Sequence, residues 1–161
     1  MAEHPITRGL YLGAGLILVP VLAVLLFVRP AQTFEKGDVI EGKAVAIDGD
    51  TIEVRVRVRV QGIAAPERYK PGGDLSTEAM RQILDGEQVR CTLTGRTNHD
   101  RQIGVCRTLD GDIGYLMVES GGARDCPKLS GGRYAVAERP GAQPIELPPY
   151  CRTGREKGPK Q

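Results

Sequence analysis

Side chains that bind anions or transfer protons are concentrated in a few short stretches of the sequence. Three arginines alternate with valines over residues 55–59, and Arg101 directly follows an aspartate. Guanidinium groups bind phosphate or carboxylate oxygens through a planar, permanently charged fork. Glu67, next to Pro66, has a carboxylate that could take a proton from water. These residue types indicate a local site for a negatively charged ligand, with acid–base chemistry beside it.

Each of these residues also has a purely structural interpretation. Alternate charged positions are typical of the solvent-facing side of a strand, and this interpretation is preferred for Arg55 and Arg57. Glu67 follows a proline, and its structural interpretation is a carboxylate at the start of a helix, where it would interact favourably with the helix dipole. His99 is interpreted as an exposed turn residue. The formal net charge is only +2, which is too small to predict nucleic-acid binding from bulk charge, so any phosphate site must be local.

The pattern of turns and short apolar runs predicts the elements that position these side chains. Glycine (21 residues) and proline (11 residues) are plentiful and aromatic residues make up 4%, which favours a turn-rich α+β domain. Strands are expected at 42–47, 52–61, 89–93 and 103–107, with a polar connection over 95–100. The uninterrupted valine and arginine alternation after Thr51 leaves open whether the chain makes a tight turn there or runs on as strand. Helices are expected at 76–84, capped by Asp74 or Ser76, at 113–120, and over 132–138.

An uncharged, mainly apolar run precedes this domain. Residues 9–28 are long enough to cross a bilayer as a helix and are bracketed by Arg8 and Arg29. We prefer an uncleaved membrane anchor, with a cleaved signal peptide as the alternative, because no small-x-small cleavage site follows the run. The remaining roughly 125 residues suffice for one modest core.

All four cysteines follow the apolar run, which predicts two disulfides in an oxidising compartment, with free buried thiols as the alternative. In a hairpin with its loop near residues 98–99, Cys91 and Cys106 lie opposite each other. Cys126 would then pair with Cys151.

Four sequence fragments occur in an informative order. They are Asp48-Gly49-Asp50-Thr51, residues 58–67 (VRVQGIAAPE), residues 100–106 (DRQIGVC), and Met117-Val118 with Gly121 and Ala123. Together they resemble the thermonuclease, or staphylococcal-nuclease-like, family over residues 43–123. The stretch with Cys126 and Cys151 resembles a cysteine-containing branch found in bacteria with two membranes.

This resemblance implies a fold and an activity. The fold is a five-stranded OB-type β-barrel with about three helices, and the activity is hydrolysis of phosphodiester bonds in DNA and RNA. Arg59 and Arg101 match the family's two phosphate-binding arginines. Glu67 matches the carboxylate base that activates water.

The resemblance also implies a calcium ion. Asp50 matches the principal aspartate ligand, the backbone carbonyl of Ala65 matches a second ligand, and Asp48 is an additional candidate. The family's other aspartate is replaced here by Ala64. Because calcium affinity falls as charged ligands are lost, the site is expected to be weak.

These inferences give one expected organisation. Residues 1–8 are cytoplasmic, 9–28 form the anchor, 29–38 a linker, 39–152 the nuclease-like domain and 153–161 a flexible tail. We expect a phosphodiesterase of the inner membrane, with its domain in the periplasm, acting on single-stranded DNA or RNA. The alternatives are a secreted form, a non-catalytic OB module that binds nucleic acid or an exopolysaccharide-type envelope polymer, and a structural component of the envelope.

Overall fold

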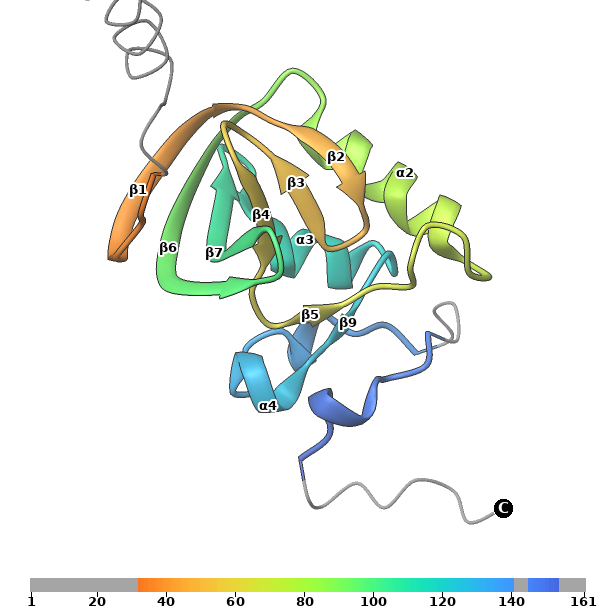
Figure 1. Ribbon diagram of the computed structural model, residues 1–161. Coiled ribbons are helices and arrows are strands. Elements are labelled where there is room, and N and C mark those ends of the chain that lie inside the picture. The colour runs from red at the N-terminus through yellow and green to blue at the C-terminus, as the bar shows by residue number, and fades with distance from the viewer. Residues whose placement is uncertain (1–31, 141–144, 154–161) are drawn as a thin grey trace, which may run out of the picture. The chain divides into compact units, whose positions relative to one another are not determined.

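The computed structural model describes residues 32–140 and 145–153 (Figure 1). The described residues from Phe34 onward belong to one compact unit. The expected anchor at 9–28 and most of the expected tail lie outside the described residues. Within the part of the chain that is described, no helix combines the length and apolar character needed to span a bilayer.

The fold is built on one strongly curved sheet. Its hydrogen-bonded order is β1-β6-β7-β4-β3-β2, with β8 added to β7. The strands are β1 (Lys36–Lys43), β2 (Val45–Asp48), β3 (Thr51–Glu53), β4 (Arg57–Val60), β6 (Gln88–Asn98), β7 (Arg101–Thr108) and β8 (Gly111–Asp112). All pairs are antiparallel except β4 with β7. Only Ala44 separates β1 from β2, so one bent stretch of chain forms both ends of this order (Figure 1).

An unbroken strand over 52–61 is wrong, and the alternative of a tight turn within the alternation is correct, because the chain reverses there. Glu53 pairs with Arg57, and the three residues between them form the turn of a hairpin. The alternation of valine and arginine continues through the turn, so periodicity alone did not reveal the reversal. Val58 and Val60 face the core, whereas Arg55 lies exposed in the turn.

The β6–β7 hairpin was expected, but its strands are longer than predicted. β6 continues to Asn98, and the turn is His99-Asp100, where His99 has a φ of 54° and is exposed. Most of the expected polar connection is therefore strand. Cys91 lies opposite Cys106 in this hairpin, and the two are joined by a disulfide, as the hairpin predicted.

The helices differ from the expected ones mainly at their ends. α2 (Gly73–Leu84) begins at Gly73, and neither Asp74 nor Ser76 caps it. The Ser76 hydroxyl instead donates to the Gly122 carbonyl, which ties α2 to the end of α3. α3 (Ile113–Glu119) matches the expected helix, and Asp112 caps it. Only a 3₁₀ turn, η1 (Ala135–Ala137), lies in the expected helix at 132–138, after the short α4 (Pro127–Ser130).

A second disulfide anchors the C-terminal part of the domain. Cys126 is bonded to Cys151, the pairing left by the hairpin disulfide. With Ala64 and Leu147 these cysteines form a small buried cluster, separate from the main core. β5 (Ile63–Ala64) pairs there with β9 (Arg124–Asp125). We call residues 145–151, which include η2 (Pro149–Cys151), the C-terminal strap.

The strap contains little regular structure, so the disulfide is central to its placement. The two cysteines are 25 residues apart in sequence. Closing a loop of this size lowers the entropy of the unfolded chain and stabilises the folded state by about 3 kcal/mol.

Candidate active site

Asp50 occupies a turn that only glycine at position 49 allows. A β-carbon on Gly49 would lie 1.7 Å from the Ser76 hydroxyl oxygen and 2.8 Å from the Ala65 β-carbon. The β2–β3 turn can therefore approach both α2 and the segment after β5 closely. The Asp48 carboxylate accepts a hydrogen bond from the Asp50 backbone N–H at 3.1 Å, which stabilises the turn. This packing fixes Asp50 beside the segment that contains Glu67.

Arg59 extends from β4 toward Asp50. Its Nη1 lies 2.6 Å from Oδ2 of Asp50, and both side chains are largely buried, with 12% and 7% exposed. Register explains the contact, because Arg59 pairs with Thr51 across the β3–β4 hairpin and the Val60 N–H donates to the Asp50 carbonyl. The other terminal nitrogen of Arg59 lies 3.4 Å from the hydroxyl of Tyr150.

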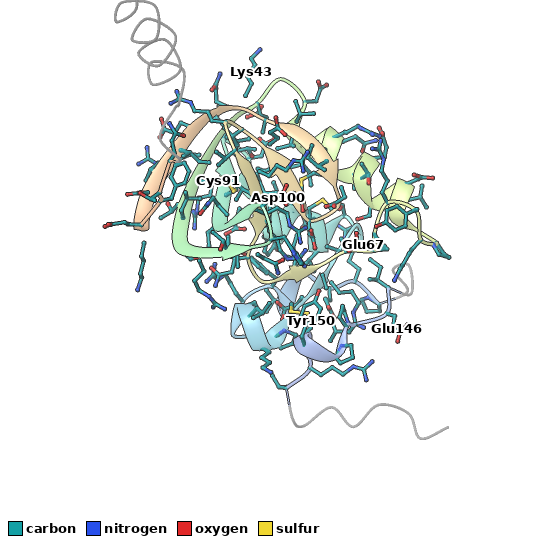
Figure 2. All side chains as sticks on the ribbon, in the orientation of Figure 1. Lys43, Glu67, Cys91, Asp100, Glu146 and Tyr150 are labelled. Carbon is teal, nitrogen blue, oxygen red and sulfur yellow. A yellow bond between two sulfur atoms is a disulfide. The ribbon has the colours of Figure 1, made fainter. Side chains whose placement is uncertain are left out.

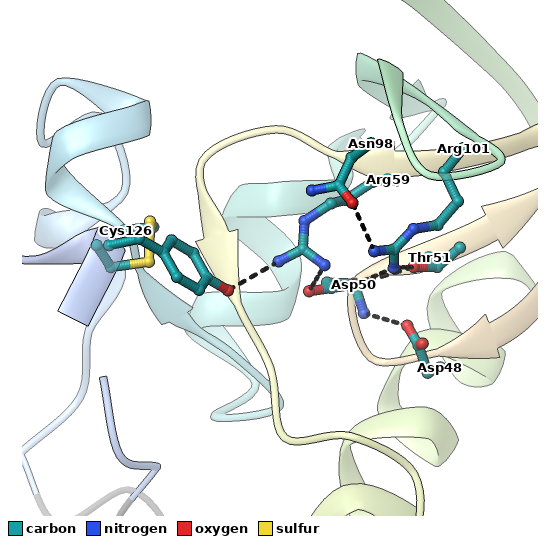
Figure 3. A network of polar contacts seen from close by, with 9 residues as sticks. Asp48, Asp50, Thr51, Arg59, Asn98, Arg101 and Cys126 are labelled. Atoms are coloured by element: carbon teal, nitrogen blue, oxygen red, sulfur yellow. Dashed lines mark hydrogen bonds and ion pairs between the residues drawn. A yellow bond between two sulfur atoms is a disulfide. The ribbon is translucent and has the colours of Figure 1, made fainter. Parts of the chain in front are cut away.

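Arg101 reaches the same place from the first residue of β7 (Figure 3). Its Nη1 donates to the Thr51 hydroxyl at 3.0 Å and lies 3.8 Å from Oδ1 of Asp50, while its Nη2 donates to Asn98 at 3.4 Å. The side chain is 20% exposed. Two guanidinium groups from neighbouring parallel strands thus converge on one carboxylate and are held in fixed orientations.

The electrostatics of Asp50 depend on its burial. Removal from water raises the pKa of this carboxyl to about 6 from 3.8, against the opposing effect of Arg59. The nearby Asp48 raises the pKa further, whereas the Thr51 hydrogen bond and Arg101 lower it. The buried charge is therefore only partly compensated by its partners.

Glu67 lies on a short segment made of two consecutive turns. The Glu67 carbonyl accepts from the Lys70 N–H at 2.8 Å, and the Lys70 carbonyl accepts from the Gly73 N–H at 2.9 Å. A β-carbon on Gly73 would lie 2.1 Å from the Glu67 carbonyl oxygen, so α2 begins directly against this segment. Glu67 itself is exposed, and it lines two pockets together with Tyr150; both residues are labelled in Figure 2. Helix packing thus fixes the backbone that carries the carboxylate.

Two pockets place Glu67 and the arginines together. One, of about 540 Å³, is lined by Asp50, Arg59, Glu67 and residues of the strap. The other, of about 380 Å³, is lined by Arg59, Arg101, Arg96 and Glu67. Three guanidinium groups face one carboxylate in the smaller pocket, so it favours an anion.

A third hollow, of about 350 Å³, extends toward Asp48 and also includes Glu67 and Arg101. Arg57 lines it but is engaged with Glu53 at 3.6 Å and Asp100 at 2.8 Å. His99 lines two of the hollows from its exposed turn.

The residues expected to bind calcium do not form a complete site. Among residues 32–140 and 145–153, no group of three or more histidine, cysteine, aspartate or glutamate side chains is placed to hold a metal ion. Arg59 and Thr51 already contact the Asp50 carboxylate. Ala64 is buried in the strap cluster, and Ala65, rather than Ala64, lines the pocket with Asp50. Since calcium takes six to eight oxygen ligands, these residues alone do not fit it.

Several site residues were missed from the sequence. Thr51 and Asn98 orient Arg101, Lys70 lines the larger pocket, and Tyr150 contacts Arg59. The position of Tyr150 next to a cysteine was the available signal, since a disulfide at Cys151 also fixes its neighbour.

Comparison with known proteins gives two kinds of relative. No protein-family model matches the chain. The chain is 35% identical over 132 residues to the "succinoglycan biosynthesis protein ExoI" of Rhizobium meliloti (strain 1021), which covers 74% of this chain and 68% of that protein. It is 36% identical over 91 residues to an "uncharacterized endonuclease" of Escherichia coli O157:H7 and to another of Escherichia coli. Those two matches cover 52% of this chain and only 60% of each endonuclease.

Proposed function

Since the chain belongs to the same family as the succinoglycan biosynthesis protein ExoI of Rhizobium meliloti, and two further relatives are named endonucleases, we propose that it is a nuclease of the thermonuclease type. The observation that carries the proposal is the convergence of Arg59, Arg101 and Glu67 on one pocket of about 380 Å³. The curved sheet, whose two ends are formed by one bent stretch of chain, supports an OB-type barrel.

The proposed reaction is hydrolysis of a phosphodiester bond. Glu67 accepts a proton from water, and the water oxygen forms a new bond to phosphorus. The bond from phosphorus to the 5′ oxygen breaks, and that oxygen leaves with the electron pair and takes a proton from solvent. Arg59 and Arg101 bind the non-bridging oxygens and stabilise the negative charge that develops on them. The products are a 3′-phosphate and a 5′-hydroxyl.

The arrangement of the two arginines supports this role. Thr51, Asn98 and Asp50 hold both guanidinium groups before any substrate binds. Preorganised donors stabilise a transition state without a reorganisation cost during the reaction. The proposed substrate is single-stranded DNA or RNA, whose phosphates are accessible.

The cellular setting and the cation are part of the proposal. The apolar run at 9–28 and the two disulfides support an inner-membrane protein with a periplasmic domain. A weakly bound calcium ion near Asp50 is proposed from the family resemblance, with Asp48 and the Ala65 carbonyl as further ligands. It would supply additional positive charge, but no step above depends on it.

The second candidate is a module that binds an envelope polymer without cleaving it. The similarity to a protein named for succinoglycan biosynthesis favours this function, and OB-type barrels also bind oligosaccharides.

Incubation of the full-length protein with single-stranded DNA and RNA, with calcium or with chelator, separates the two candidates. Cleavage is expected, and Glu67→Gln and Arg101→Ala are each expected to lower turnover by roughly 10² to 10³-fold. Arg55→Ala is the matched control, because Arg55 is exposed in the β3–β4 turn and lines none of the three pockets. Binding without cleavage would favour the second candidate. Equal losses from Arg55→Ala and Arg101→Ala would show that the arginines form a general binding surface.

A further inference from the structure

The C-terminal strap contributes an aromatic wall to the candidate active site. Tyr150 lies 91 positions beyond Arg59 in sequence, yet its hydroxyl is 3.4 Å from Nη2 of that arginine. Tyr150 lines both the 540 Å³ pocket and the 380 Å³ pocket, as Arg59 and Glu67 also do. It therefore stands where the two pockets meet, beside the proposed site of phosphate chemistry.

The exposure of Tyr150 differs from that of Tyr134, the buried tyrosine of the core. Tyr134 is 1% exposed and donates to Asp112, so it is a core residue. Tyr150 is 51% exposed, and only its hydroxyl has a polar partner among the described residues. About half of the residue is therefore accessible to solvent, and it lines two of the pockets.

The strap holds this ring by covalent and polar links. Cys151, the next residue, is fully buried and bonded to Cys126, which immediately precedes α4. The carbonyl of Leu147 accepts from Arg152 at 3.2 Å, and the carbonyl of Ile145 accepts from Arg124 at 3.4 Å. Pro148 and Pro149 restrict the backbone just before the tyrosine. The ring is thus attached to a rigid support.

The residues around Tyr150 indicate which class of ligand the pockets bind. Arginines line both pockets and bind phosphate, but they do not distinguish one kind of phosphate-containing chain from another. An accessible aromatic ring beside a phosphate-binding arginine adds a surface on which a nucleobase can stack. The apolar side chains of Leu129 and Ile103 line the pocket of about 380 Å³ together with Tyr150. A ring, apolar side chains and arginines together fit one nucleotide unit.

We propose that Tyr150 is a substrate-binding residue that stacks on a base next to the scissile phosphate, and that the Cys126–Cys151 disulfide holds it in place. This inference rests on the proposed function, because it assigns a subsite to the same cleft. It makes single-stranded nucleic acid, with unpaired bases, the substrate class. It also makes substrate binding dependent on the oxidised state of the strap.

Binding of fluorescent oligonucleotides tests the inference separately from cleavage. The full-length protein, purified in mild detergent and carrying Glu67→Gln to preserve the DNA, is titrated against an eight-nucleotide thymidine strand. A second strand of equal length and charge has abasic sites in place of its bases. Tyr150→Ala should weaken binding of the first strand on the order of tenfold, the usual cost of losing one stacked base. It should leave binding of the abasic strand within twofold.

Three further variants make the test specific. Tyr150→Phe keeps the ring and should bind both strands like the parent. Tyr115→Ala is the matched control, since Tyr115 is 38% exposed on α3 and lines none of the three pockets. Replacing both Cys126 and Cys151 with serine should weaken binding of the base-bearing strand as Tyr150→Ala does, while circular dichroism checks that the fold persists.

Several outcomes would overturn the inference. Tyr150→Ala could weaken binding of the two strands equally, or weaken binding of neither. A large loss of binding in Tyr150→Phe would assign the effect to the contact of the hydroxyl with Arg59 instead of to stacking. Absence of cleavage by the wild-type protein would reject the proposed hydrolysis, but base-dependent binding through Tyr150 would still stand.

Discussion

The buried carboxylate of Asp50 makes a specific prediction about stability. Its pKa is about 6 in the folded protein, compared with 3.8 for an unperturbed aspartate. The folded state therefore binds this proton more tightly than the unfolded state does. The stabilisation is fully present below pH 3.8 and is lost as the pH rises through about 6.

The size of the effect follows from the two pKa values. A difference of one pKa unit corresponds to 1.36 kcal/mol, so the change from 3.8 to about 6 amounts to about 3 kcal/mol. The Asp50 side chain is only 7% exposed, so little solvent screening reduces this figure. Asn has nearly the shape of a protonated aspartate and does not titrate. The Asp50→Asn variant should therefore lack this pH-dependent loss.

Urea denaturation of both proteins between pH 4 and pH 7.5, in chelator, measures the effect. The free energy of unfolding of the wild type, minus that of Asp50→Asn, should fall by roughly 2 kcal/mol between pH 4 and pH 7, since part of the full effect is already lost at pH 4. Subtraction removes the titration of groups that the two proteins share. Asp110→Asn, at an exposed position, is the control and should follow the wild type. A difference that rises with pH would refute the reasoning, because it would mean that Arg59 and Arg101 outweigh the burial.

Two further predictions concern the cation and the membrane. Calcium should raise the rate of cleavage only at unusually high concentration, and Ala64→Asp should lower that concentration in a titration of activity because each charged ligand raises affinity; equal cleavage by both proteins with calcium and in chelator would contradict this. A reporter that is active only in the periplasm, fused after Gln161, should be active, because the disulfides require an oxidising compartment. Activity of a cytoplasmic reporter alone would reverse the orientation.

Local patterns in the sequence predicted much of the fold. The β6–β7 hairpin and its disulfide followed from alternation over Cys91 and Leu93, and α3 followed from its apolar residues and the glycines after it. The turn at residues 54–56 did not follow, because a hairpin and a straight strand share the same alternation of valine and arginine. The start of α2 was also missed, since Ser76 binds the distant Gly122 carbonyl instead of capping its helix.

Some residues of the candidate site could be predicted from the sequence and others could not. Arg59, Arg101 and Glu67 lie in fragments whose order resembles a known family, so their proximity could be anticipated before the structure showed that they line one pocket. The contacts of Asn98 and Tyr150 with the two arginines depend on tertiary packing. A tyrosine 91 positions from its arginine leaves no periodic signal in the sequence. Only the prediction that Cys151 is paired indicated that this segment returns to the domain.

Ala64 affects both the expected calcium site and the packing of the C-terminal strap. The Ala64 side chain is 1% exposed and belongs to the cluster formed by Leu147 and the Cys126–Cys151 disulfide. A carboxylate at this position would lose its hydration among apolar neighbours, which is costly unless a cation or a hydrogen-bond donor compensates it. Alanine instead lets β5 pack directly against the disulfide that fixes Tyr150. The residue that weakens the expected calcium site is thus the one that fits the strap. The Ala64→Asp variant should therefore show its gain in calcium affinity together with a looser strap and weaker base-dependent binding.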